Sequence, residues 1–317
     1  MATRRSPLLL AAAILAVGLA LSVVLSEYNL RLLNLSVITA IAVIGFNFAF
    51  GLAGLISLGH AAFVGMSAYT VAILTTATGW SPWAAIPMAV AGTVLFSALI
   101  GYPLLRLKGH YLALATLGLN VSFFIITANW LSLTGGTNGI PGIPQLRLHG
   151  YFISGERYFL RFGLVFLAAV AAAALAFQRS RHGRAMIAAR DDEIAAAMSG
   201  IDVTRVRVAA FALSAACAAV AGALFAEHVR FIAPEDFGYV HSITYLAMLI
   251  VGGEGSVVGA ILGAVLLTFL PEWLRFLGNA YLAFFAAMML AILIFLPRGL
   301  VSLFRRRAPR RIAEGRS

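Results

Sequence analysis

The sequence predicts an all-α polytopic membrane protein with about ten transmembrane or re-entrant helices. Three observations support this fold class. The chain of 317 residues is 62% hydrophobic and only 11% charged. Its mean hydropathy of +0.95 is far higher than a soluble domain needs. Apolar stretches that can cross a hydrocarbon core of roughly 30 Å recur from one end of the chain to the other.

These apolar stretches define the expected helices of a single transmembrane domain, 1–304, which is followed by a basic tail, 305–317. They cover residues 8–25, 32–50, 55–77, 83–104, 111–130, 159–178, 207–227, 243–252, 256–271 and 278–296. The first follows a basic start, as in a signal peptide, but its apolar run is long for a signal core. We therefore expect an uncleaved first span. The stretch 243–252 is too short to span, so it either extends back towards Tyr239 or is re-entrant.

The distribution of Lys and Arg predicts the orientation. When crossings alternate, all but six of the 23 basic residues fall on the side of the N-terminus, which the positive-inside rule makes cytoplasmic. That side carries the turn at Arg106 and Lys108, the loop 179–206 and the tail. The tail reaches it only if 240–271 crosses twice or folds back on itself, with a break at "GGEG" (252–255). Both termini are therefore predicted to be cytoplasmic.

Small residues recur at helical spacing in two of the expected spans. Glycines stand at 255, 259 and 263, and Ser214, Ala218 and Gly222 show the same interval of four. Such faces let helix backbones approach closely in lipid. We interpret both sets as packing surfaces.

Several function classes lack the residues that they need. All twelve acidic residues lie in loops or near span ends, whereas ion-coupled transporters usually carry ionisable groups at mid-span. The only lysine, Lys108, stands in "RLKGHY", so the chain has no P-loop and no ATP site of that kind. Cys217 is the only cysteine and the histidines are scattered, which predicts no metal site. We do not expect an enzyme. We do not expect a nucleic-acid-binding protein either, since the net charge of +11 is explained by Lys and Arg that orient the membrane spans.

Polar residues inside apolar stretches are candidates for a translocation path: Asn47, Ser57, Gly59, His60 and Asn120. Transporters tend to expose backbone polar groups where glycine-rich or broken segments lie near mid-membrane, which draws attention to the turn 51–60. For His60 and the two asparagines, a hydrogen-bonded packing role between helices is the favoured interpretation.

The stretch "GRAMIAARDDEIAAAMSGID" (183–202) is unusually polar for this chain. Its helix-forming residues between two glycines predict a helix over 185–199. Ile187, Ile194 and Met198 would then form a narrow apolar stripe bordered by Asp191. Such a helix could lie on the membrane surface, present its face to a groove on a partner, or serve as a solvated connector.

Five motifs in order resemble the permease subunits of branched-chain amino acid ABC importers, specifically of the LivM type. They are "GLAGLISLGHAAFVGMSAY" (51–69), "RLKGHYLALATL" (106–117), "TGGTNGIPGIP" (134–144), "GRAMIAARDDEIAAAMSGID" (183–202) and "VGGEGSVVGAILGA" (251–264). Leu55 departs from the pattern, since the family often has Gln there. If that Gln helps to shape the translocation path, a different substrate preference is expected here.

The resemblance implies a multi-pass protein of the bacterial inner membrane that works with several partners. These are a homologous second permease, two ABC ATPases that bind the ATP and a periplasmic substrate-binding protein. The helix near 185–199 would receive the motion of an ATPase, with Arg190, Asp191, Asp192 and Glu193 orienting it and the apolar stripe filling a groove. The coupling residues so implied are Gly183, Arg184, Ile187, Arg190, Asp191, Asp192, Glu193, Ile194, Met198 and Gly200.

Alternatives to this reading differ in cargo or in mechanism. Related permeases carry urea, short amides or aromatic acids, and the sequence leaves the cargo open. It also leaves open whether the permease pair is a hetero- or a homodimer. An ion-coupled secondary transporter is disfavoured by the absence of mid-span acids, and a membrane-embedded enzyme by the absence of a nucleophile–base pair.

The charge distribution makes a prediction about topology. A reporter enzyme that is active only in the cytoplasm should be active when fused to the C-terminus. A reporter that is active only in the periplasm should be silent there and active when inserted in the segment 131–158. The opposite pattern of activities would contradict the predicted orientation.

Overall fold

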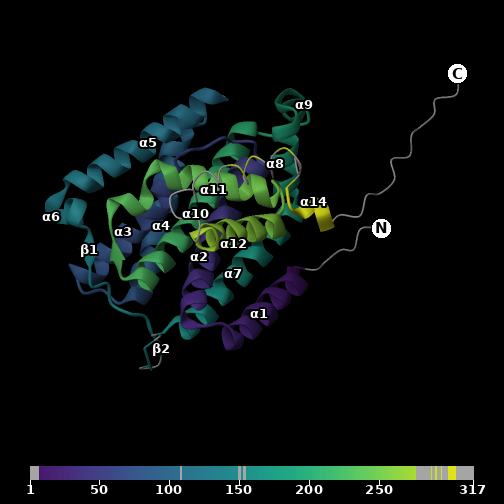
Figure 1. Ribbon diagram of the computed structural model, residues 1–317. Helices are drawn as coiled ribbons and strands as arrows, with labels where there is room; N and C mark the ends of the chain where they lie inside the picture. The colour runs from purple at the N-terminus through teal and green to yellow at the C-terminus, as the bar shows by residue number, and fades with distance from the viewer. Residues whose placement is uncertain are drawn as a thin grey trace, which may run out of the picture.

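The computed structural model describes residues 7–107, 109–148, 151–152, 155–275, 287, 290, 294 and 299–304, which form a helical bundle (Figure 1). In this part of the chain, six helices are long and apolar enough to cross a membrane. They are α1 (Pro7–Val24), α2 (Glu27–Asn47, extended by the π-helix η1, Phe48–Leu52), α4 (Pro82–Leu104), α5 (His110–Asn129), α7 (Glu156–Arg179) and α10 (Val203–Val229).

Three shorter apolar helices complete the bundle: α3 (His60–Thr76), α11 (Tyr239–Gly252) and α12 (Val257–Trp273). The all-α membrane fold is thereby confirmed, and α11 does extend back to Tyr239. The segment 278–296 is almost wholly outside the described residues, as are Lys108 and the tail 305–317. The count of about ten crossings and the cytoplasmic location of both termini stay predictions.

The remaining elements are short and lie between the long helices. Two of them, α8 (Arg181–Asp191) and α9 (Glu193–Met198), separate α7 from α10, and α14 (Val301–Phe304) lies near the C-terminus. The others are α6 (Leu131–Thr134), η2 (Gly136–Asn138), η3 (Pro234–Phe237), β1 (Ile140–Pro141), β2 (Arg147–Leu148), β3 (Tyr151–Phe152) and β4 (Phe231–Ile232). The strands form two antiparallel pairs, β1 with β4 and β2 with β3.

Helices α2 and α10 form the centre of the bundle. Helix α10 packs on α2, α3 and α4, while α2 also contacts α7 and α12. Close approach depends on small residues, as the spacing of Ser214, Ala218 and Gly222 predicts. A Cβ at Gly222 would collide with the carbonyl oxygen of Val64, and one at Gly45 would lie 2.5 Å from Cβ of Cys217. Helix α1 packs along α7, so it belongs to the same bundle.

Helices α11 and α12 fold back on each other after the predicted break. Their axes differ by 120°, and Gly253 and Gly255 between them adopt positive φ angles of 118° and 73°. The two arms touch through glycine: a Cβ at Gly259 would lie 2.7 Å from the carbonyl oxygen of Gly252. A Cβ at Gly263 would collide with the carbonyl oxygen of Met248. The chain therefore turns back at "GGEG", as the charge distribution requires.

Segments that alternating crossings assign to one side do meet at one end of the bundle. Residues 54–56, Leu107 and Gly109 line the same cavity as Glu193 and Arg207. At the end of the bundle far from α9, where Figure 1 shows β1, the pairing of β1 with β4 joins the segment after α6 to the segment after α10. Over this part of the chain, successive loops thus lie at alternate ends of the bundle, in agreement with the topology predicted from charge.

The glycine contacts between α11 and α12 predict a site-specific effect of one methyl group. Gly263→Ala should lower the thermal unfolding midpoint of the purified protein in detergent by several degrees, because overpacking typically costs about 1–3 kcal/mol. Gly92→Ala in α4 is the matched control, since a Cβ there would meet nothing within 4 Å. The control should be neutral or stabilising because Ala is the better helix former. Equal midpoints for the two variants would contradict the packing seen here.

Candidate functional site: a polar segment and two interrupted helices

The polar segment, residues 180–202, connects α7 to α10 and consists of two short helices with well-defined ends. The Ser180 side chain accepts a hydrogen bond from the Gly183 amide at the start of α8, and Asp202 does the same for Arg205 at the start of α10. Helix α9 ends in a Schellman motif, in which Gly200 has φ 82° and Ile201 N–H donates to Ala196 O over 3.1 Å. The segment is therefore structured throughout.

The prediction of one continuous helix over 185–199 is wrong, because the helix breaks at Asp192. This residue is extended (φ −153°, ψ 109°), and its Oδ1 accepts from the amides of Ile194 and Ala195 at 2.9 and 3.0 Å. Aspartate is among the preferred N-cap residues, since its short carboxylate satisfies amides that a continuing helix would bond internally. The loop is also shorter than 179–206, because α7 reaches Arg179 and α10 begins at Val203.

The break also separates the residues of the expected apolar stripe. Ile187 packs partly into the bundle beside Met186, which is 1% exposed. Ile194 and Met198 on α9 are 74% and 87% exposed. The expectation that these three side chains share one face is therefore wrong. Of the three, only Ile194 and Met198 on α9 are largely open to a partner.

An ion pair attaches α9 to the bundle. The two carboxylate oxygens of Glu193 accept from the guanidinium nitrogens of Arg207 on α10, at 3.2 and 3.0 Å. The Arg207 side chain is only 18% exposed. Bidentate pairs of this kind fix geometry as well as adding energy. Helix α9 is thus held against α10 while its apolar residues face outward.

Arg190, at the end of α8, binds the chain's own backbone. Its Nη1 donates to the carbonyl oxygen of Gly51 over 2.5 Å, and its Nε donates to Asp191 Oδ1 over 3.2 Å. Gly54 leaves room for the arginine stem, since a Cβ there would lie 2.7 Å from Arg190 Cγ. Gly51 belongs to η1, so this contact connects the polar segment to the region where α2 is interrupted.

The interruption between α2 and α3 comprises η1 and the irregular residues 53–59. Side chains from distant helices satisfy its backbone. The Leu58 amide donates to Thr116 Oγ1 of α5 over 2.9 Å. Just after the interruption, the Ala61 amide in the first turn of α3 donates to Ser242 Oγ of α11 over 2.9 Å. Irregular backbone inside a membrane bundle needs such partners because no water is present to replace them.

The side chains predicted for the translocation path are buried within this chain. Asn47, Ser57, His60 and Asn120 are all at most 3% exposed. His60 Nε2 lies 2.9 Å from the Ala42 carbonyl oxygen and Nδ1 lies 3.3 Å from Ser214 Oγ, while Asn120 donates to the Phe237 carbonyl over 3.2 Å. A Cβ at Gly59 would lie 2.7 Å from the Thr116 carbonyl oxygen. This geometry favours the packing interpretation, and a role in substrate contact stays a prediction.

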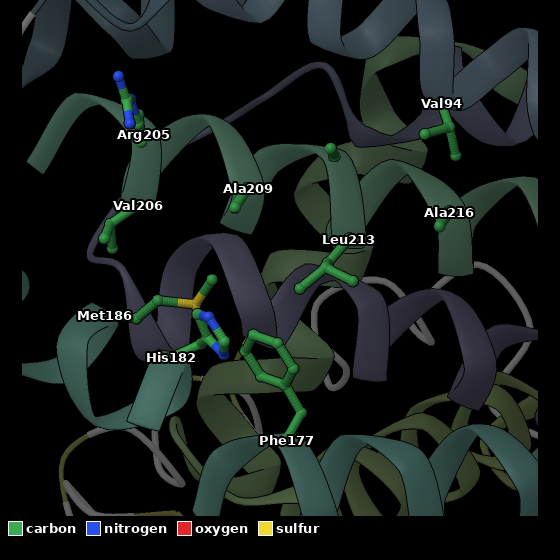
Figure 2. A pocket seen from close by; sticks show the side chains of 10 residues that line it. Val94, Phe177, His182, Met186, Arg205, Val206, Ala209, Leu213 and Ala216 are labelled. Atoms are coloured by element: carbon green, nitrogen blue, oxygen red, sulfur yellow. The ribbon is translucent and has the colours of Figure 1, made fainter. Parts of the chain in front are cut away.

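Two cavities border the polar segment. The larger, about 540 Å³, is an apolar groove between α4, α7, α8 and α10. The side chains of Phe177, His182, Met186 and Leu213 point toward one another around it (Figure 2). The smaller, about 160 Å³, is lined by Gly54, Leu55, Ile56, Leu107, Gly109, Leu112, Glu193 and Arg207. Leu55, the departure from the family pattern, is therefore next to α9 at this end of the bundle.

Within the described residues, no group of three or more His, Cys, Asp or Glu side chains is placed to hold a metal ion. Thr116, Ser242 and Arg207 were not predicted as site residues. A serine or threonine in an apolar helix gives no sign of which amide it will satisfy. The charge pattern identifies Arg207 only as one of the cytoplasmic basic residues. Glu193 lies fourteen residues before it, a separation at which two helices joined by a short turn can bring the side chains together.

The chain is similar to known proteins over most of its length. The chain is 33% identical over 316 residues to the high-affinity branched-chain amino acid transport system permease protein LivM of Salmonella typhimurium, covering 92% of this chain and 74% of that protein. LivM of Escherichia coli is equally similar. LivH of Escherichia coli is 25% identical over 288 residues, covering 83% and 90% of the two chains. No solved structure matches the chain.

The family model for the branched-chain amino acid transport system permease component matches residues 28–296, from α2 through the segment after α12. The match includes both interrupted helices and the whole polar segment. The bundle described above, with its two interruptions and its capped, ion-paired polar segment, is thus that of a chain that belongs to the branched-chain amino acid transport permease family.

Proposed function

We propose that this chain is a permease subunit of an ATP-driven importer for branched-chain or related amino acids. It forms half of the translocation path and receives the motion of a separate ATPase subunit through the polar segment. One observation carries the coupling role: α9 exposes Ile194 and Met198 while Asp192 and the Glu193–Arg207 ion pair hold it rigidly. A short rigid helix with an exposed apolar face suits a groove on a partner.

Other subunits complete the proposed machine. Relatives named LivM and LivH both match this chain over most of its length, which supports a homologous second permease as the partner in the membrane. Two ABC ATPases would bind ATP beneath the pair, and a periplasmic binding protein would dock at the opposite end, near β1 and β4. The subunits would assemble in the bacterial inner membrane, with both termini of this chain in the cytoplasm.

The attachments of the polar segment explain how force could pass from an ATPase into the bundle. Glu193 connects α9 to α10, and Arg190 connects α8 to η1. Both contacts are hydrogen bonds to a charged group, which are stronger than neutral ones. A push on the exposed face of α9 would therefore be transmitted to α10 and to the interruption after α2.

Reconstitution tests the transport activity. This chain, a second permease and the ATPase subunits in liposomes should take up leucine, isoleucine or valine when binding protein is outside and ATP inside. Uptake of labelled urea, short amides and aromatic acids would identify a different cargo for the same machine. Uptake by this chain alone under a proton or sodium gradient, without ATPase, would contradict the proposal. A complex that shows ATP-independent uptake would contradict it as well.

The exposed residues of α9 give a second prediction. The double variant Ile194→Ser and Met198→Ser should reduce co-purification of the ATPase with the permease pair by about tenfold or more, since burying each apolar side chain contributes about 1.5–3 kcal/mol. Phe231→Ser is the matched control, because this 43% exposed side chain of β4 lies at the opposite end of the bundle. Undiminished co-purification in the double variant would contradict docking at α9.

A further inference from the structure

A chain of contacts leads from α8 to both interrupted helices. Arg190 donates to the carbonyl oxygen of Gly51 over 2.5 Å. One helical turn before Gly51, the Oδ1 atom of Asn47 accepts from the Gly255 amide over 2.8 Å. Gly255 lies in the break between α11 and α12. We call Arg190, Gly51, Asn47 and Gly255 the interhelix junction.

Glycine is required at two positions of the junction. A Cβ at Gly51 would collide with Asn47 Oδ1 and would lie 2.7 Å from the Gly255 amide nitrogen. Gly255 has a φ angle of 73°, in the region that side chains disfavour. The two interruptions therefore meet backbone to backbone, and the buried side chain of Asn47 (1% exposed) bonds across them.

A third segment contacts the same break. The Leu300 amide donates to the Val251 carbonyl oxygen over 2.8 Å, and a Cβ at Gly299 would lie 2.5 Å from Gly253 Cα. Residues 299–300, which precede α14, therefore pack against the break between α11 and α12. Four segments thus converge here: α8, the end of α2 with η1, the break at 253–256, and residues 299–300. Of these, α8 also precedes the exposed α9.

We propose that Arg190 is a positioning residue that links the polar segment to both helix interruptions, so that a displacement of α8 moves the 48–59 and 253–256 segments together. The proposal rests on the proposed function and adds the route of coupling inside the permease. An interruption lacks the continuous hydrogen-bond ladder of a helix and is where the backbone can bend at least cost. A rigid link to two such points converts one push into two coordinated movements.

The link depends on the arginine geometry. The guanidinium donates to Gly51 and to Asp191 at once, so the side chain is fixed between its own helix and η1. Lysine has a point charge on a flexible stem and cannot hold both acceptors in one plane. Asp191 is 62% exposed and pairs with Arg190 at 3.2 Å, so it orients the guanidinium without burying a second charge.

The test uses the intact complex in liposomes and measures ATP hydrolysed per substrate imported. Arg190→Ala should keep subunit assembly and keep hydrolysis within about twofold of wild type, while uptake falls about tenfold or more. Arg190→Lys should be intermediate. Arg205→Ala is the matched control. Arg205 also pairs with an aspartate, Asp202 at 2.9 Å, but it is 88% exposed and shows no side-chain bond to a distant segment among the described residues. The control should match wild type.

Two further variants separate the link from simple loss of stability. Gly54→Ala leaves the charge in place, puts a methyl group 2.7 Å from Arg190 Cγ and strains a backbone at φ 68°. It should lower uptake per ATP in the same direction, and the ratio is measured only on complex that assembles. Asn47→Ala removes the second contact of the junction. The Asn47→Ala and Arg190→Ala double variant should lower uptake per ATP no further than the poorer single variant does, because both substitutions interrupt the same route.

Three results would overturn the link: normal uptake per ATP in Arg190→Ala, proportional loss of hydrolysis and uptake in an assembled complex, or additive losses in the double variant. Should Arg190→Ala fail to assemble, the Gly54→Ala and Asn47→Ala variants decide the question by the same ratio. The proposed function would be refuted instead if the wild-type permease pair bound no ATPase, or if the wild-type complex showed no ATP-dependent uptake. The two failures are therefore distinguishable.

Discussion

The need to satisfy every backbone polar group inside the bundle governs the architecture around the candidate site. In hydrocarbon an unpaired N–H or C=O costs several kcal/mol, so a helix can be interrupted only where other groups replace the lost ladder. Thr116, Ser242 and Asn47 supply those groups from α5, α11 and α2. Each interruption is thereby fixed to helices far away in the sequence, and the interruptions become points where distant elements are mechanically joined.

Close backbone contact is the second consequence. Apolar side chains give little driving force for helix association in lipid, because the surrounding tails are as apolar as they are. Packing must come from backbones that nearly touch, as Gly252 and Gly259 do between α11 and α12 and as Gly222 does against α3. The same small residues that bring helices together also leave room for polar links such as the one through Gly51.

The sequence was informative where a pattern was local. Hydropathy located the nine long apolar helices among the described residues, and charge alternation required the turn at 252–255. The break at Asp192 was missed because a helical periodicity assumes a continuous helix, whereas one capping carboxylate outweighs the propensity of the alanines around it. The partner of Arg190, 139 residues away, was inaccessible for a different reason: a backbone carbonyl carries no signature in the residue type.

The division between buried and exposed parts of the polar segment bears on how the family can vary its partners. Met186 and Ala189 are buried against the bundle, and Arg190 and Glu193 bond to it. The permease's own packing and hydrogen bonds therefore constrain these four positions. Ile194 and Met198 contact little of this chain, so they are free to match whatever surface docks there. If a partner docks on α9 as proposed, a change of partner is met first by changes at these two exposed positions. The route from α8 into the interrupted helices can stay the same.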